Sequence, residues 1–212
     1  MRRGIVLLLM VGLLAACGPG DWINRLPYAG PVERTLDRGA FLPGTPIQYL
    51  GQSDEGARLS IEGREKVKEI GDRVDWKEDV TAGVNLDQTY RVAQIGAESL
   101  HLAGTVRVIV QNAVPRPGAA NREAPIHFQF PVGYHVKVGQ VIPGTTLTFL
   151  GVGEGGAELD NLAGDPYRQL DDPILWEGAL GSNIWLALAV RPTLISDEQL
   201  DVVGTADLWI QP

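Results

Sequence analysis

Apolar and polar residues alternate with a period of two along the most regular parts of the chain, as in half-buried β-strands. The clearest stretches are residues 84–90 and 105–110. An antiparallel hairpin centred on residue 97 pairs Val84 with Val110 and Asp87 with Arg107, so that apolar side chains meet and the two charges are opposite. The alternation therefore predicts both the strands and their register.

The same pattern returns 100 residues further along. Residues 41–51 (FLPGTPIQYLG) align with residues 141–151 (VIPGTTLTFLG), and residues 31–112 share 21 identities with residues 131–212 over 82 positions without a gap. We therefore predict a tandem duplication of a unit of about 80 residues. With about six short strands in each copy, we expect an all-β fold of two small β-barrel or β-sandwich domains.

The N-terminus carries the most specific motif of the chain. Arg2 and Arg3 precede an apolar run over residues 4–16, which is too short to span a bilayer. Leu14-Ala15-Ala16-Cys17 resembles the lipobox of bacterial lipoproteins. The resemblance implies cleavage before Cys17, a lipid on its sulfur and palmitate or another acyl chain on the new amino terminus. An ordinary secretory signal with an incidental cysteine is the alternative.

These features divide the chain into five segments. The lipobox resemblance covers the signal alone, and it implies a location on the extracytoplasmic side of the cell membrane, with the lipid on Cys17 as the membrane contact. We expect a signal peptide at 1–16, a lipidated tether at 17–30, a first β domain at 31–112, a Pro/Ala-rich connector at 113–130 and a second β domain at 131–212.

Composition narrows the class of partner. Loss of Arg2 and Arg3 leaves 16 Lys and Arg against 26 Asp and Glu, a formal charge of −10. Such a chain has no basic stripe with which to neutralise phosphates, so we expect no nucleic-acid partner. A single cysteine supports neither an internal disulfide nor a zinc site. The 26 Gly and 14 Pro residues are typical of a turn-rich chain.

Several motifs resemble those of catalytic or metal sites, but their context in the sequence favours a structural role. The GxGxxG of residues 151–156 lies between two strand patterns, so we interpret it as a hairpin loop and not a dinucleotide site. The three histidines are not shared by the two copies, and the acidic residues of the second copy lack the spacing of an EF-hand. We expect no catalytic residue, metal or cofactor. The three histidines are His101, His127 and His135, and the acidic residues of the second copy are Glu154, Glu158, Asp160, Asp165, Asp171 and Asp172.

Polar residues kept in both copies are open to two interpretations. They either mark two related ligand sites or are turn and cap residues that the fold requires, and the second is favoured because they lie beside glycines or at strand ends. The pairs are Thr45/Thr145, Asp72/Asp172, Arg91/Arg191, Glu98/Glu198 and Gln111/Gln211. Trp76/Trp176 is interpreted as a core anchor of each copy.

The copies differ on one predicted sheet face. In the second copy the equivalent hairpin is centred on residue 197. It places Leu186 opposite Leu208 on the inner face and Trp185 opposite Trp209 on the outer face. Polar residues of the first copy become Ala187 and Ala189 beside them. Trp185 and Trp209 are therefore the candidate binding or interface residues. Either the first domain or the connector covers them, or an envelope protein or glycan does.

Taken together, these observations predict a membrane-anchored extracytoplasmic lipoprotein that acts as a non-catalytic binding or envelope-interaction module. We do not expect an enzyme. Two alternatives stay open, namely a hydrolase of envelope polymers that uses acidic residues, and a purely structural spacer subunit.

Overall fold

The computed structural model describes residues 25–212, which fold into fifteen β-strands and no helix. The predicted all-β class is therefore confirmed. The predicted signal peptide, Cys17 and the tether up to residue 24 lie outside the described residues. Within residues 25–212, no helix has the length and apolar character needed to cross a membrane.

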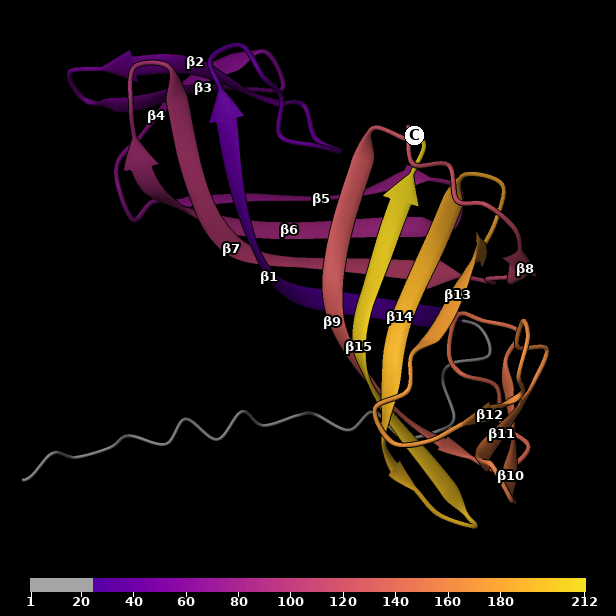
Figure 1. The fold of residues 1–212 in the computed structure, drawn as a ribbon. Coiled ribbons are helices and arrows are strands. Elements are labelled where there is room, and N and C mark those ends of the chain that lie inside the picture. Colours follow the sequence, from indigo (N-terminus) through magenta and orange to yellow (C-terminus); the bar gives the residue numbers. More distant parts are fainter. Residues whose placement is uncertain (1–24) are drawn as a thin grey trace, which may run out of the picture.

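The first half of the described chain forms two antiparallel sheets. A four-stranded sheet has the order β1-β7-β6-β5, and a three-stranded sheet, β2-β3-β4, lies over one end of it (Figure 1). The strands are β1 (Arg25–Asp37), β2 (Ile47–Ser53), β3 (Gly56–Ile61), β4 (Arg64–Lys68), β5 (Arg73–Thr81), β6 (Val84–Ile95) and β7 (Ser99–Gln111).

The second half repeats this order of strands about 100 residues later. Its large sheet has the order β8-β13-β14-β15-β9, where β8 (Arg116–Pro117) comes from the connector, and its small sheet is β10-β11-β12. In both halves the strand order of each sheet is open and does not close on itself. The remaining strands are β9 (Ile126–Lys137), β10 (Thr148–Gly153), β11 (Gly156–Asp160), β12 (Tyr167–Arg168), β13 (Ile174–Ala179), β14 (Ile184–Ile195) and β15 (Gln199–Ile210).

The registers of the two long hairpins are those that the sequence predicts. In the first half Val84 pairs with Val110 and Asp87 with Arg107. In the second half Ile184 pairs with Ile210. Each hairpin has one bulge, between Val92 and Gln94 in the first and between Pro192 and Leu194 in the second. Both bulges lie far along the ladder from these pairs, so they leave the predicted pairing intact.

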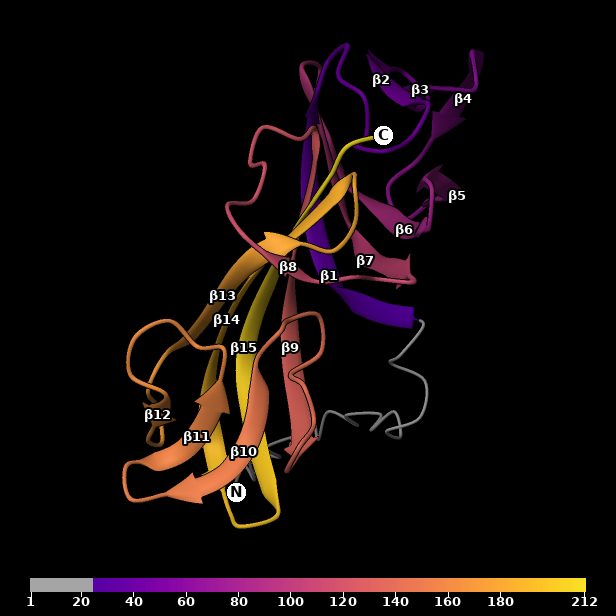
Figure 2. The ribbon, with the colours of Figure 1, turned by 90° about the vertical axis from the view of Figure 1, so that its right-hand side faces the viewer.

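The two halves share one apolar core, although their strands pair only within a half or with β8. Contacts across the junction are reciprocal. A Cβ at Gly44 would lie 3.0 Å from Ile126 of the second half. A Cβ at Gly144 would lie 3.7 Å from Leu26 of the first half, and Leu26 is the counterpart of Ile126. Figures 1 and 2 show the strands of the two large sheets crossing where they overlap. The halves are therefore separate in strand pairing and joined by side-chain packing and side-chain hydrogen bonds, with orthogonal layers.

The strands begin earlier than the expected segment boundaries. β1 starts at Arg25, so residues 25–30 belong to the first strand and not to the tether. β9 starts at Ile126, inside the expected connector. The reason is apolar burial, because alternate side chains such as Leu26 and Tyr28 point into the core at the junction with the other half.

Candidate functional site

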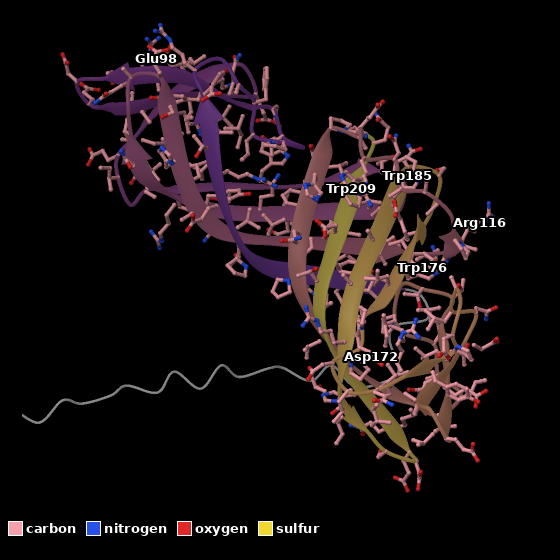
Figure 3. All side chains as sticks on the ribbon, in the orientation of Figure 1. Glu98, Arg116, Asp172, Trp176, Trp185 and Trp209 are labelled. Atoms are coloured by element: carbon pink, nitrogen blue, oxygen red, sulfur yellow. The ribbon has the colours of Figure 1, made fainter. Side chains whose placement is uncertain are left out.

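The outer face of the five-stranded sheet carries the two candidate tryptophans. Trp185 on β14 pairs with Trp209 on β15, and their neighbours Leu186 and Leu208 are fully buried on the opposite face. Figure 3 labels the two residues on neighbouring strands near one end of the sheet. The strand phase predicted for this hairpin is therefore confirmed, since neither Trp replaces the inner leucines.

This outer face is largely apolar in the second half and charged in the first. The register places small and apolar side chains on neighbouring strands, and at matching positions the first half has acids, bases and polar residues. We define the outer face by Leu175, Glu177, Trp185, Ala187, Ala189, Arg191, Val203, Thr205, Asp207 and Trp209. The counterparts are Asp75, Lys77, Asn85, Asp87, Thr89, Arg91, Ala103, Thr105, Arg107 and Ile109.

Trp209 is buried by its neighbours. Only 9% of the residue is exposed. The imidazole of His127 stacks on its indole at 4.8 Å between ring centroids, and the guanidinium of Arg122 lies 5.4 Å from the same ring centroid. Because Arg122 belongs to the connector, the connector covers this end of the outer face. Trp209 is thus an anchor for the connector.

Glu177 holds the connector in that position. Its two carboxylate oxygens accept hydrogen bonds from the backbone N–H of Ala120 at 2.7 Å and from the Arg122 guanidinium at 3.2 Å. Its backbone carbonyl accepts a third from the N–H of Gly118 at 3.1 Å. These bonds link the connector to β13 at both the main chain and the side chain.

The remaining part of the outer face is open to solvent. Trp185 is half-buried, Ala189 is exposed, and the exposed fractions of Leu175 and Val203 are 63% and 49%. Leu175 and Ala189 lie directly opposite one another on β13 and β14. This leaves exposed apolar side chains on the face beside the connector.

Two carboxylates flank this surface. Glu177 and Asp207 lie on either side of Ala187 in the register. Asp207 accepts hydrogen bonds from His127 at 2.9 Å and Gln129 at 3.1 Å, while Glu177 is bonded to the connector. Both acids therefore already hold neighbouring elements in place.

The histidines lie apart from one another. His101 is within hydrogen-bond distance of Thr35, His127 of Asp207, and His135 of Asp201 at 2.7 Å. Across residues 25–212 no three side chains of His, Cys, Asp or Glu gather as metal ligands would. The acidic residues singled out in the second half lie in its strands and turns, where Asp165 accepts the N–H of Tyr167 at 2.9 Å.

Two pairs of shared polar residues have the same structural role in both halves. Thr45 and Thr145 each donate to the carbonyl three residues earlier, at 2.9 and 2.8 Å, and accept the N–H two residues later. Asp72 and Asp172 each accept the backbone N–H three residues earlier, at 3.0 and 2.7 Å. These are local turn bonds, which supports the cap interpretation of these residues.

The remaining sequence motifs also take structural positions. Residues 151–153 end β10 and pair with β11, which begins at Gly156, so that residues 154–155 form the turn of the expected hairpin. Trp176 is buried and its indole N–H donates to Thr146 at 3.1 Å. Trp76, its counterpart, is half-buried against the core.

A buried polar cluster in the first half escaped the sequence analysis. Gln88 is fully buried on the inner face of β6, donates to the carbonyl of Pro43 at 2.9 Å and accepts the hydroxyl of Tyr90 at 3.2 Å. Burial raises the pKa of Tyr90 to about 12, against the lowering effect of the Arg34 guanidinium. The sequence did contain a signal for this cluster, because Gln88 occupies a position of the β6 alternation that points into the core, where a polar side chain needs a hydrogen-bond partner.

Comparisons of the chain with protein-family models, with curated proteins and with solved structures found no match.

Proposed function

We propose that this protein is a lipid-anchored extracytoplasmic lipoprotein that acts as a non-catalytic binding or envelope-interaction module. The outer face of the five-stranded sheet is its contact surface. One observation carries the proposal. The second half exposes Leu175 and Ala189 and half-exposes Trp185, whereas the first half has polar residues at the matching positions, one of them charged. These polar residues are Asp75, Thr89 and Asn85.

The partner that fits this surface is an envelope protein or glycan. A flat strip with an indole at one end and carboxylates at its margins offers stacking together with hydrogen-bond acceptors. Glu177 and Asp207 supply those acceptors, and each is already oriented by neighbouring donors. Exposed apolar side chains beside an oriented polar margin are the usual composition of a contact surface.

Photo-crosslinking tests the contact surface directly. A photoreactive residue at position 175 is compared with one at position 75, its counterpart on the charged sheet, in cells that express the full chain. We expect a specific adduct from position 175 alone, and Ala189→Asp should remove it while the matched control Thr89→Asp should not. Equal adducts from both positions would contradict the proposal.

The lipid anchor needs a separate test. Replacement of Cys17, the single thiol, by serine should abolish incorporation of a labelled fatty acid and release the protein from membranes. Label that persists on the serine variant would refute the anchor. The same cells distinguish the alternatives, since loss of polymer cleavage on mutation of an acid favours a hydrolase, and no adduct at either position favours a spacer.

A further inference from the structure

A polar pocket of about 160 Å³ lies between two equivalent hairpin turns. One turn joins β5 to β6 and the other joins β13 to β14, so each half of the chain supplies one wall. The amide of Asn183 donates to the hydroxyl of Thr81 at 3.0 Å, which links the two turns directly. The pocket is therefore preformed in the fold.

The lining of this pocket is rich in uncharged hydrogen-bonding groups. Besides Thr81 and Asn183, the lining residues include Gln111, Asn112 and Ser182. Val84, Val110 and Ile184 form the apolar part of the wall. Hydroxyls and amides of this kind bind phosphate oxygens and the hydroxyls of a polyol, and the apolar wall accommodates the adjoining carbon chain.

The pocket lies next to the point where the membrane tether enters the fold. Arg25, the first described residue, pairs with the pocket residue Gln111. Cys17 is eight residues before Arg25. An extended segment of that length reaches on the order of 27 Å. A lipid on Cys17 therefore keeps this end of the molecule close to the headgroups.

Two exposed arginines, Arg25 and Arg116, lie near the pocket in the strand register of a chain that is otherwise acidic. Arg25 is exposed beside Gln111, and Arg116 is exposed on β8, where it pairs with Ala179 beside the pocket residue Leu180. Figure 3 shows Arg116 at the margin of the molecule, pointing away from the ribbon. Asp79, two residues before Thr81, accepts a bond from the amide of Asn85 at 3.1 Å.

We infer that this pocket binds the glycerophosphate headgroup of an anionic phospholipid in the membrane that carries the protein. The inference depends on the lipid anchor of the proposed function. The neutral lining contacts the phosphate and glycerol oxygens, while Arg25 and Arg116 attract the anionic surface. Headgroup binding holds the chain against the membrane in one orientation, which a flexible tether alone does not impose.

Vesicle binding tests this inference with the chain from residue 18 onward, which contains every described residue and lacks the lipid. The probes are vesicles of phosphatidylcholine alone and vesicles with one part phosphatidylglycerol to two parts phosphatidylcholine. We expect binding to the anionic vesicles only. The double variant Arg25→Glu/Arg116→Glu should weaken it by at least about tenfold, and Arg64→Glu, a distant exposed control on β4, should not.

The pocket itself is tested by Ser182→Phe, which fills it and leaves both arginines in place. We expect this variant to lose its preference for phosphatidylglycerol while its thermal unfolding stays cooperative. Vesicle binding that is unchanged in Ser182→Phe would overturn the pocket assignment. Binding that inorganic phosphate displaces as well as phosphatidylglycerol does would identify a free phosphate site and overturn the lipid assignment.

This design separates failure of the pocket from failure of the proposed function. Fatty-acid labelling of Cys17 reports the anchor, and crosslinking at position 175 reports the contact surface, without vesicles. Absent vesicle binding by the wild-type chain, with normal labelling and crosslinking, would overturn only the headgroup inference.

Discussion

The imidazole of His127 lies nearly parallel to the indole of Trp209, with 4.8 Å between the ring centroids and 11° between the ring planes. The two residues are directly opposite on β9 and β15, and Arg122 contacts the indole as well. This stacking makes Trp209 part of the folded framework, whereas Trp185, on the neighbouring strand, stays half-exposed.

The two tryptophans should therefore differ in their contribution to stability. Replacing Trp209 by alanine removes a buried ring and its contacts with His127 and Arg122, and we expect a loss of about 3–4 kcal/mol in the free energy of unfolding. Trp185→Ala should cost roughly half as much, because its ring is partly hydrated in the folded state. Urea unfolding of both variants gives the comparison, and equal losses would show that the connector does not depend on Trp209.

A second prediction concerns the contact between the two halves at Gly144. Gly144 has φ of 81°, and a Cβ there would lie 2.6 Å from the Tyr28 hydroxyl. Gly139 has φ of 79° and no atom within 4 Å of such a Cβ, so it is a matched control for backbone strain alone. We expect Gly139→Ala to cost about 1 kcal/mol and Gly144→Ala to cost about 2 kcal/mol more.

Rescue distinguishes the clash from a general effect on the loop. The Tyr28 hydroxyl has no hydrogen-bond partner among the described residues, so Tyr28→Phe should change stability little by itself. Combined with Gly144→Ala, it should recover part of the loss. The readout is the free energy of unfolding in urea, and a strictly additive double variant would count against direct contact.

The third prediction is a loss of stability in alkali that depends on Tyr90. Burial raises the pKa of Tyr90 from 10.0 to about 12. The unfolded chain therefore loses this proton first, and the stabilisation is complete below pH 10 and is lost as the pH rises from 10 to 12. Over that range the wild type should lose about 1.4 kcal/mol per pH unit more than Tyr90→Phe does.

Tyr90→Phe also removes the hydrogen bond to Gln88, so its stability at neutral pH should be lower by about 1 kcal/mol. The diagnostic quantity is the slope of unfolding free energy against pH and not its value at one pH. Parallel slopes for the two proteins above pH 10 would mean that the Tyr90 hydroxyl ionises in the folded state as readily as in water.

The fourth prediction separates a turn residue from a catalytic acid at Asp172. Its carboxylate accepts the N–H of Gln169 at 2.7 Å, and Asp72 does the same for Glu69 at 3.0 Å. We expect Asp172→Ala and Asp72→Ala each to cost about 1 kcal/mol in stability and to leave the adduct from position 175 intact. An Asp172→Ala protein of normal stability that fails to form the adduct would contradict the structural role.

The sequence alone determined the strands and the pairing of the long hairpins. Alternation with period two shows which side chains point inward, and a short turn then leaves one register that matches apolar to apolar. The alternation and the turn are both local features of the chain. For this reason the pairs Val84–Val110 and Trp185–Trp209 were correctly predicted. The tandem duplication inferred from the same alignment stays a prediction.

What packs against each buried face was decided by the tertiary structure alone. The pattern marks Leu26 and Ile126 as apolar, yet only the crossing of the two large sheets places them at the glycine loops of opposite halves. In the same way, the connector brings Arg122 over Trp209, and two distant turns meet at Thr81 and Asn183. The hydrophobic effect is non-directional, so a sequence shows that a face is buried and leaves its partner to the packing of the whole chain.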